Sequence, residues 1–353
     1  MVIDLNVRRV KKSRLSEIDF DNLPFGRVFS DHMVEIDYAS GEWQEPSIVP
    51  YAPLSLSPSL SALHYGQSIF EGMKCHVDAN NGDLLLFRPE ANAERLNRSA
   101  KRMDMPQLPV EMFMTCLREL LDIDRQWVPN RPNTSLYIRP FMFATDGVVG
   151  VHSSESYKFI IFTCPVGPYY SQPVKVLVAD EFVRAFPGGT GEAKCAGNYG
   201  ATMYPASLAK KQGYDQILWM DATNKQKIDE SGTMNVMFVI DNVLITPVLD
   251  GTILDGITRA SLLELAQDLG YTTQERDITI SEVLSANENG TLQDAFGAGT
   301  AATIAPIAGI GYKDNYYSLP PVEGRTVSAH LKRELDCLKR GISEDRFGWI
   351  VRI

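Results

Sequence analysis

The sequence lacks the features of several protein classes. The 353-residue chain has no apolar run near the roughly 18 residues that span a bilayer, and its N-terminus lacks the apolar core of a signal peptide. Its five cysteines form no CxxC pair, and its five histidines lack the spacing of metal ligands. The formal net charge of −10 argues against a nucleic-acid binder. We therefore expect a cytoplasmic protein that binds no metal, membrane or nucleic acid.

Length and proline content predict two domains. Single hydrophobic cores stop growing at about 250–300 residues, so 353 residues favour a division. The stretch Pro165–Pro173 has three prolines and a glycine, which is typical of a connection between domains. We predict an N-terminal domain at 1–165, a linker at 166–173 and a C-terminal domain at 174–353. The basic cluster at residues 8–14 is interpreted as a solvated N-terminal arm.

Hydrophobic periodicity predicts mixed helices and strands in both halves. In the first half, helices are expected from Pro89 and over 110–121, with β-strands at Ser135–Thr145 and Tyr157–Val166. In the second half, strands are predicted at Val174–Ala179, Gln216–Met220, Val236–Ile240 and Val243–Thr246, and helices at Tyr199–Gln212, Thr258–Leu269 and Thr326–Arg340. The pattern indicates an α/β fold.

The densest chemical signal is a glycine-rich stretch around Lys194, at residues 186–200. A phosphate-binding loop does not fit it, because Lys194 follows Ala193 and precedes Cys195 where that motif needs glycine before the lysine and serine or threonine after it. Two interpretations remain open on the residues alone. One is a flexible surface loop with a solvated lysine. The other is a lysine that forms a Schiff base, for which small neighbours leave room.

Several segments, in order along nearly the whole chain, resemble branched-chain aminotransferases, which are fold-type-IV pyridoxal-phosphate enzymes. They are Lys194-Cys-Ala-Gly-Asn-Tyr-Gly, Glu230-Ser-Gly-Thr-Met-Asn, Phe296-Gly-Ala-Gly-Thr-Ala, His64-Tyr-Gly-Gln-Ser-Ile-Phe-Glu-Gly-Met-Lys and Leu136-Tyr-Ile-Arg-Pro. The resemblance implies an open α/β N-terminal domain and a C-terminal domain with a barrel-like β core. It also implies a homodimer.

The resemblance further implies that the chain binds pyridoxal 5′-phosphate. Lys194 would carry the cofactor and move the substrate proton, and Glu230 would keep the pyridine nitrogen protonated. The remaining cofactor contacts that it implies are Arg95, Tyr199, Ile257, Thr258 and Thr300. Arginine grips phosphate with parallel hydrogen bonds, and a helix start favours an anion.

For the substrate, the resemblance implies a pocket made by Phe25, Tyr65, Phe70, Tyr137, Arg139, Thr233 and Ala301. Arg139 is informative, because an arginine within the apolar run Leu136–Phe143 needs a partner, and the side-chain carboxylate of glutamate would provide one. The implied reaction transfers the amino group of leucine, isoleucine or valine to 2-oxoglutarate and gives glutamate.

Two kinds of alternative remain. A D-amino-acid aminotransferase or an aminodeoxychorismate lyase has the same fold, but the Leu-Tyr-Ile-Arg-Pro segment and the chain length favour the branched-chain enzyme. A non-catalytic phosphate- or nucleotide-binding protein would use the glycine-rich loop differently. The colour of the purified protein distinguishes the two kinds of alternative.

Overall fold

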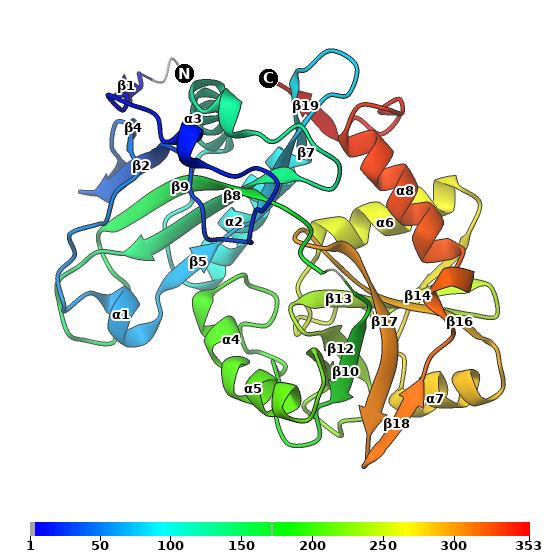
Figure 1. Ribbon diagram of the computed structural model, residues 1–353. Coiled ribbons are helices and arrows are strands. Elements are labelled where there is room, and N and C mark those ends of the chain that lie inside the picture. The colour runs from blue at the N-terminus through cyan, green and yellow to red at the C-terminus, as the bar shows by residue number, and fades with distance from the viewer. Residues whose placement is uncertain (1–3, 171) are drawn as a thin grey trace. The chain divides into compact units, whose positions relative to one another are not determined.

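The computed structural model describes residues 4–170 and 172–353 (Figure 1). Backbone contacts divide the chain into two compact units. The first unit comprises the described residues up to Tyr169 together with Ala193–Gly197 and Cys337–Ile353. The second unit comprises Tyr170–Glu192 and Asn198–Asp336. The predicted domain ranges remain a prediction, and each unit is described separately below.

The first unit is built on a ten-stranded sheet, in which the strands follow the order β1-β4-β2-β9-β8-β6-β7-β19, with β3 paired to β2 and β5 to β8. The strands are β1 (Asn6–Val7), β2 (His32–Ala39), β3 (Glu42–Trp43), β4 (Ser47–Pro50), β5 (Ser68–Phe70), β6 (Met73–Val77), β7 (Leu84–Phe87), β8 (Ser135–Ala144), β9 (Tyr157–Val166) and β19 (Ile350–Arg352). The helical segments are η1 (Leu15–Glu17), α1 (Ser61–Tyr65), α2 (Pro89–Arg102), α3 (Val110–Ile123) and η2 (Arg125–Trp127). The long central strands β8 and β9 pair antiparallel along their whole length.

The helices α2 and α3 bury one apolar face each in the core of this unit. Leu96 and Ala100, four residues apart on α2, are fully buried, as are Leu117 and Leu121 on α3. Pro89 lies at the start of α2, where its missing N–H breaks no helical hydrogen bond. Both helices confirm the predictions from the sequence. Truncating a fully buried leucine such as Leu117 to alanine costs about 2–5 kcal/mol of stability.

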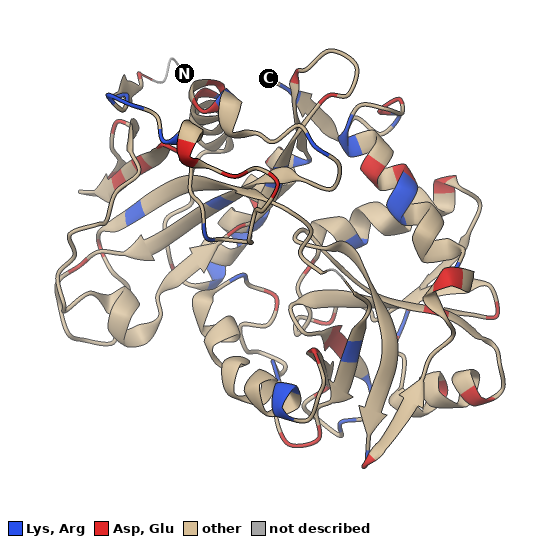
Figure 2. Ribbon diagram, viewed as in Figure 1, with Lys and Arg blue, Asp and Glu red and all other residues tan. Residues whose placement is uncertain are grey.

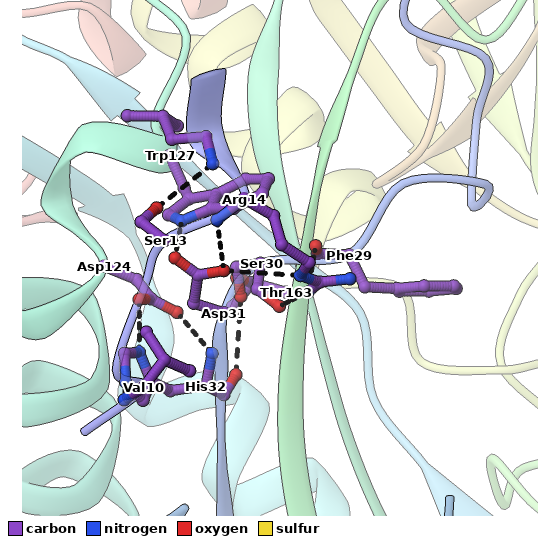
Figure 3. Close-up of polar contacts among 11 residues, drawn as sticks. Val10, Ser13, Arg14, Phe29, Ser30, Asp31, His32, Asp124, Trp127 and Thr163 are labelled. Atoms are coloured by element: carbon purple, nitrogen blue, oxygen red, sulfur yellow. Dashed lines mark hydrogen bonds and ion pairs between the residues drawn. The ribbon is translucent and has the colours of Figure 1, made fainter. Parts of the chain in front are cut away.

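A buried carboxylate fixes the N-terminal segment to the sheet (Figure 3). Asp31 accepts hydrogen bonds from the backbone N–H of Arg14 at 3.2 Å and from Nε1 of Trp127 at 3.1 Å. Burial alone would raise the pKa of Asp31, but hydrogen bonds from Ser13, Arg14 and Trp127 outweigh it and lower that pKa. The anchor therefore strengthens as Asp31 ionises.

A buried histidine makes a second anchor beside the first (Figure 3). The backbone N–H of Val10 donates to Nε2 of His32 at 3.0 Å, so this ring nitrogen carries no proton. Nδ1 of His32 then holds the ring proton and donates it to Asp124 at 2.7 Å. The basic arm therefore has a defined attachment, while its side chains at Arg8, Arg9 and Lys11 are exposed.

The second unit contains a nine-stranded sheet that closes on itself. Its strands follow the order β12-β11-β10-β17-β16-β13-β14-β15, and β12 also pairs with β13, which completes a ring of β10, β11, β12, β13, β16 and β17. The strands are β10 (Val174–Val178), β11 (Gln216–Met220), β12 (Ile228–Ser231), β13 (Met234–Ile240), β14 (Val243–Thr246), β15 (Thr272–Glu275), β16 (Leu292–Gly299), β17 (Thr303–Tyr312) and β18 (Asn315–Ser318). This closed ring confirms the predicted barrel-like core and the α/β class.

Helices complete the second unit. They are α5 (Met203–Lys211), α6 (Ile257–Asp268), α7 (Ile280–Glu288) and the short η3 (Val322–Gly324), while α4 (Ala196–Gly200) and α8 (Val327–Lys339) each include residues of both units. None of the helices in the described chain combines the length and apolar character that crossing a lipid bilayer requires.

One predicted helix was wrong in its continuity. The sequence predicts a single helix over Tyr199–Gln212, but the structure has α4 and α5 with a turn between them. At the break, the hydroxyl and the backbone N–H of Thr202 both donate to the carbonyl of Tyr199, at 2.8 and 3.1 Å. A threonine hydroxyl can replace a helical hydrogen bond in this way, and the preceding Gly200 weakens the helix further.

Candidate active site

Lys194 is held through its backbone in the first unit. Its N–H donates to Oγ of Ser99 at 2.9 Å, and its carbonyl accepts from the N–H of Phe70 at 3.0 Å. The adjacent Cys195 forms an isolated β-bridge with Ile69. The Lys194 Nζ atom lies 4.8 Å from the centre of the Phe70 ring. The main chain is thus held by two hydrogen bonds, and the residue is partly exposed.

A buried ion pair lies next to this lysine. Arg95 donates from Nε and Nη2 to the two carboxylate oxygens of Glu71, at 2.7 and 2.9 Å. Burial alone would raise the pKa of the fully buried Glu71, but the charge and hydrogen bonds of Arg95, together with the charge of Lys194, lower it. Asn92 donates a further hydrogen bond at 2.8 Å. Glu71 is therefore a fixed negative charge between two cations.

Four of the predicted substrate residues form one cluster in the first unit. The Arg139 guanidinium lies 4.7 Å from the centre of the Phe70 ring and donates from Nη2 to the Tyr137 hydroxyl at 2.9 Å. Tyr137 in turn packs edge-on against Phe25, with ring centres 5.0 Å apart. The Nε atom of Arg139 is buried without a hydrogen-bond partner among the described residues. The cluster thus combines aromatic walls with an incompletely satisfied cation.

Gly72 leaves room for the Tyr137 side chain of this cluster. A Cβ atom on Gly72 would collide with the hydroxyl of Tyr137, so no larger residue fits there without a shift. The fifth predicted substrate residue of this unit, Tyr65, lies at the end of α1 and is 42% exposed.

Glu230 is a buried carboxylate on the barrel of the second unit, where β12 carries two adjacent acidic residues (Figure 2). One oxygen accepts from the backbone N–H of Leu254 at 2.9 Å and from the amide of Asn235 at 3.4 Å. The other lies 3.0 Å from Nε of Arg184, an ion pair whose two side chains are almost completely buried. The carboxylate is therefore oriented by donors on one side and by a positive charge on the other.

Asn235 links Glu230 to the segment just before α6, because its side chain contacts both. Asn235 donates to the carbonyl of Leu254 at 2.9 Å, and a Cβ atom on Gly256 would collide with the Asn235 amide oxygen. The N-cap residue of α6 is Gly256, which has no side chain to cap the first N–H groups at Ile257 and Thr258. Uncapped N–H groups and the helix dipole together favour an anion.

The other predicted residues of the second unit lie in turns or at a helix end. Tyr199 is half-buried on α4. Thr233 is exposed in the tight turn between β12 and β13. Thr300 and Ala301 are half-buried in the turn between β16 and β17. All of the predicted site residues are thus placed in one unit or the other, as two separate groups.

Three residues of these groups were missed by the sequence reasoning. Glu71 stood within a quoted motif but received no role. Ser99 follows Arg95 by four residues, so the two share one face of α2, and that spacing was the available signal. Arg184 gave no signal, because its partner Glu230 is distant in sequence.

The chemistry of these donor sets fits pyridoxal phosphate. The cofactor has an aldehyde, a pyridine nitrogen and a phosphate, which need an amine, a carboxylate and a cluster of N–H donors. Lys194 supplies the amine in the first unit, while Glu230 and the uncapped start of α6 supply the other two in the second. Among the described residues, no group of three or more His, Cys, Asp or Glu side chains could hold a metal ion.

Comparisons with known proteins agree over most of the chain. A family model described as amino-transferase class IV matches residues 68–310. A probable branched-chain-amino-acid aminotransferase of Staphylococcus epidermidis is 42% identical over 98% of each chain. Branched-chain-amino-acid aminotransferase 2 of Bacillus subtilis is 44% identical over 95% of this chain and 93% of its own. The crystal structure of a branched-chain aminotransferase from Thermoproteus uzoniensis with norvaline matches with a TM-score of 0.74 and 25% identity, over 90% of this chain and 98% of that one.

Proposed function

The chain belongs to the class IV amino-transferases, which depend on pyridoxal phosphate, and we propose that it transfers amino groups reversibly between branched-chain amino acids and 2-oxoglutarate. The observation that carries the proposal is the likeness, over nearly the full length, to enzymes named for that activity. The cluster of Arg139 with Phe70 and Tyr137 supports it independently.

The proposed cofactor site uses residues of both groups. Lys194 binds the cofactor covalently, and Glu230 pairs with the ring nitrogen. Phosphate contacts come from Arg95, Thr300 and the N–H groups of Ile257 and Thr258, and Tyr199 contacts the phenolic oxygen. When bound, pyridoxal phosphate supplies a protonated ring that withdraws electrons from the substrate α-carbon. Arg95 donates two hydrogen bonds to Glu71, so binding phosphate would require the guanidinium to share its donors between Glu71 and the phosphate.

Lys194 also moves the substrate proton in this proposal. A free amine at Nζ would accept the proton from the substrate α-carbon and deliver it to the carbon of the cofactor's aldehyde group. The backbone hydrogen bonds to Ser99 and Phe70 support this role, because they fix the main chain from which the Lys194 side chain extends. Geometry held in this way lowers the entropic cost of proton transfer.

The proposed substrate pocket comprises Phe25, Tyr65, Phe70, Tyr137, Arg139, Thr233 and Ala301. It must accept both an aliphatic side chain and the carboxylate of glutamate. The aromatic rings suit the first, whose burial contributes about 1.5–3 kcal/mol. Arg139 suits the second, because its Nε atom is buried without a hydrogen-bond partner among the described residues and its Nη2 bonds only a tyrosine hydroxyl in that cluster.

The proposal extends to organisation and location. We propose 1–165 and 174–353 as the two domains in sequence, joined by 166–173, with Ala193–Gly197 and Cys337–Ile353 contributing to the compact unit of the first. A homodimer is supported by the loop between β8 and β9, where Val149 and Val151 are 67% and 88% exposed. Neighbouring apolar side chains that are exposed to this extent favour a surface that another chain covers. A cytoplasmic location is supported by the five cysteines, all of which are free thiols.

A visible absorption spectrum tests the proposal. The purified protein with pyridoxal phosphate should be yellow, and L-leucine should shift its absorption, with L-glutamate doing the same. D-alanine is the control that separates the branched-chain enzyme from a D-amino-acid aminotransferase, and it should leave the spectrum unchanged. A colourless protein after incubation with the cofactor, or a response to D-alanine alone, would contradict the proposal.

A further inference from the structure

Arg184 contacts three separate segments of the second unit, at Glu230, Gly191 and Thr252. Besides its ion pair with Glu230, its Nη2 atom donates to the carbonyl of Gly191 at 3.3 Å and to the carbonyl of Thr252. A Cβ atom on Gly191 would collide with that same Thr252 carbonyl, so the packing around the guanidinium is tight. The N–H of Nε makes no hydrogen bond with any of the described residues, so charge, and not hydrogen bonding, couples Arg184 to Glu230.

A second buried carboxyl group accompanies Glu230 on β12. Asp229 is 4% exposed, and its Oδ2 atom has no hydrogen-bond partner among the described residues. It interacts electrostatically with Arg184 as well as with Glu230. Two carboxyl groups therefore compete for one buried guanidinium, although only Glu230 is paired with it at 3.0 Å.

We propose that Arg184 is a positioning residue that keeps Glu230 ionised and oriented toward the cofactor ring. Asp229 must then stay neutral, so that the charge of Arg184 stabilises the Glu230 carboxylate alone. The inference rests on the proposed function. An ionised Glu230 is needed there, because a protonated carboxyl could not hold the proton on the ring nitrogen. Arg184 supplies the charge that favours the ionised form.

The surroundings of Asp229 favour its neutral form at pH values below about 7. The pKa of Asp229 is raised to about 7, mainly by burial and further by the negative charges of Asp250, Glu230 and Asp221, while Arg184 opposes the rise. Asp250 lies in the loop after β14 and Glu230 on β12. Asp221 directly follows β11, and Arg184 lies in the segment after β10. Above pH 7 the ionised Asp229 carboxylate also attracts the Arg184 guanidinium. The electrostatic interaction between Arg184 and Glu230 therefore weakens.

Cofactor affinity as a function of pH tests this inference without turnover. The probe is 4′-deoxypyridoxine 5′-phosphate, which has the ring nitrogen and the phosphate but no aldehyde, so it forms no covalent bond with Lys194. Its binding to the apoprotein is measured between pH 6 and 8.5 for the unaltered protein, Asp229→Asn, Arg184→Lys and Arg184→Gln. Asp277→Asn is the matched control, because it removes a half-exposed carboxylate of the same unit that pairs with Lys227 at the surface.

We expect the unaltered protein to lose affinity above pH 7 relative to Asp229→Asn, by about tenfold, the effect of one pKa unit of coupling. Arg184→Gln should bind weakly at every pH, Arg184→Lys should recover part of the affinity, and Asp277→Asn should follow the unaltered protein. Parallel pH profiles for the unaltered protein and Asp229→Asn would overturn the inference, whatever the folding of the Arg184 variants. If the unaltered protein bound neither the probe nor pyridoxal phosphate, the proposed function would fail first, which separates the two failures.

Discussion

Replacing Asp229 with asparagine should stabilise the apoprotein at high pH and flatten its dependence on pH. In the folded state the pKa of Asp229 is raised to about 7, chiefly by burial, whereas the ordinary value is 3.8. Between those two values the folded protein keeps a proton that the unfolded chain has lost. The stability that this group contributes therefore falls as the pH rises through that window, and it stops falling once the folded form has ionised near pH 7.

The size of the effect follows from the two pKa values. They differ by about three, and one pKa unit corresponds to about 1.4 kcal/mol, so ionised Asp229 costs on the order of 4 kcal/mol at pH 8. Asparagine has nearly the same shape and cannot ionise. The variant should therefore gain stability over the unaltered protein at pH 8 and little or none at pH 4.

Urea unfolding of both apoproteins at pH 4, 6 and 8, followed by tryptophan fluorescence, measures the difference. Asp277→Asn again serves as the control, because that carboxylate is half exposed and pairs at the surface. If the gain of Asp229→Asn changed by less than about 1 kcal/mol between pH 4 and pH 8, Asp229 would not be a carboxyl group that burial keeps neutral.

Three further predictions concern the proposed chemistry. Borohydride reduction of the holoenzyme followed by peptide mapping should place the label on Lys194, and a label on Lys210 or Lys211 would refute that role. Glu230→Gln should retain the cofactor but lose most of its turnover, since a neutral amide cannot keep the ring nitrogen protonated; near-normal turnover would contradict the assignment. Arg139→Ala should lower kcat/KM for glutamate by roughly ten- to a hundredfold, the loss of a charge-assisted pair of about 1.5–3 kcal/mol, and spare leucine; equal losses for both substrates would make Arg139 structural.

Local patterns in the sequence predicted the elements that carry strong apolar periodicity. The stripe on α3 and the position of Pro89 at the start of α2 were both readable, because each depends on neighbours within two turns of a helix. The strands β16 and β17 were not identified as strands. Both are rich in glycine and alanine, which have little intrinsic preference for a strand, and pairing within the closed ring overrides that weakness.

The candidate site divides in the same way. Lys194 and Glu230 could be predicted because each stands in a contiguous motif. The contacts that orient them could not, because Ser99 lies 95 residues from Lys194 and Arg184 belongs to a different segment from β12. Only a folded chain brings such groups into contact, and the sequence around Ser99 and Arg184 does not name Lys194 or Glu230 as their partner.

The parallel pairing of β10 with β17 has a consequence for biosynthesis. Val174 pairs with Ile307, so β10 leaves the ribosome about 130 residues before its partner strand exists. At about 5–20 residues per second, that edge waits roughly 7–26 seconds without its final neighbour. A nascent chain with an unpaired apolar edge is a target for aggregation and for chaperones. Yield in a cell should therefore depend on what shields β10 during that interval, even though the finished ring leaves this edge covered.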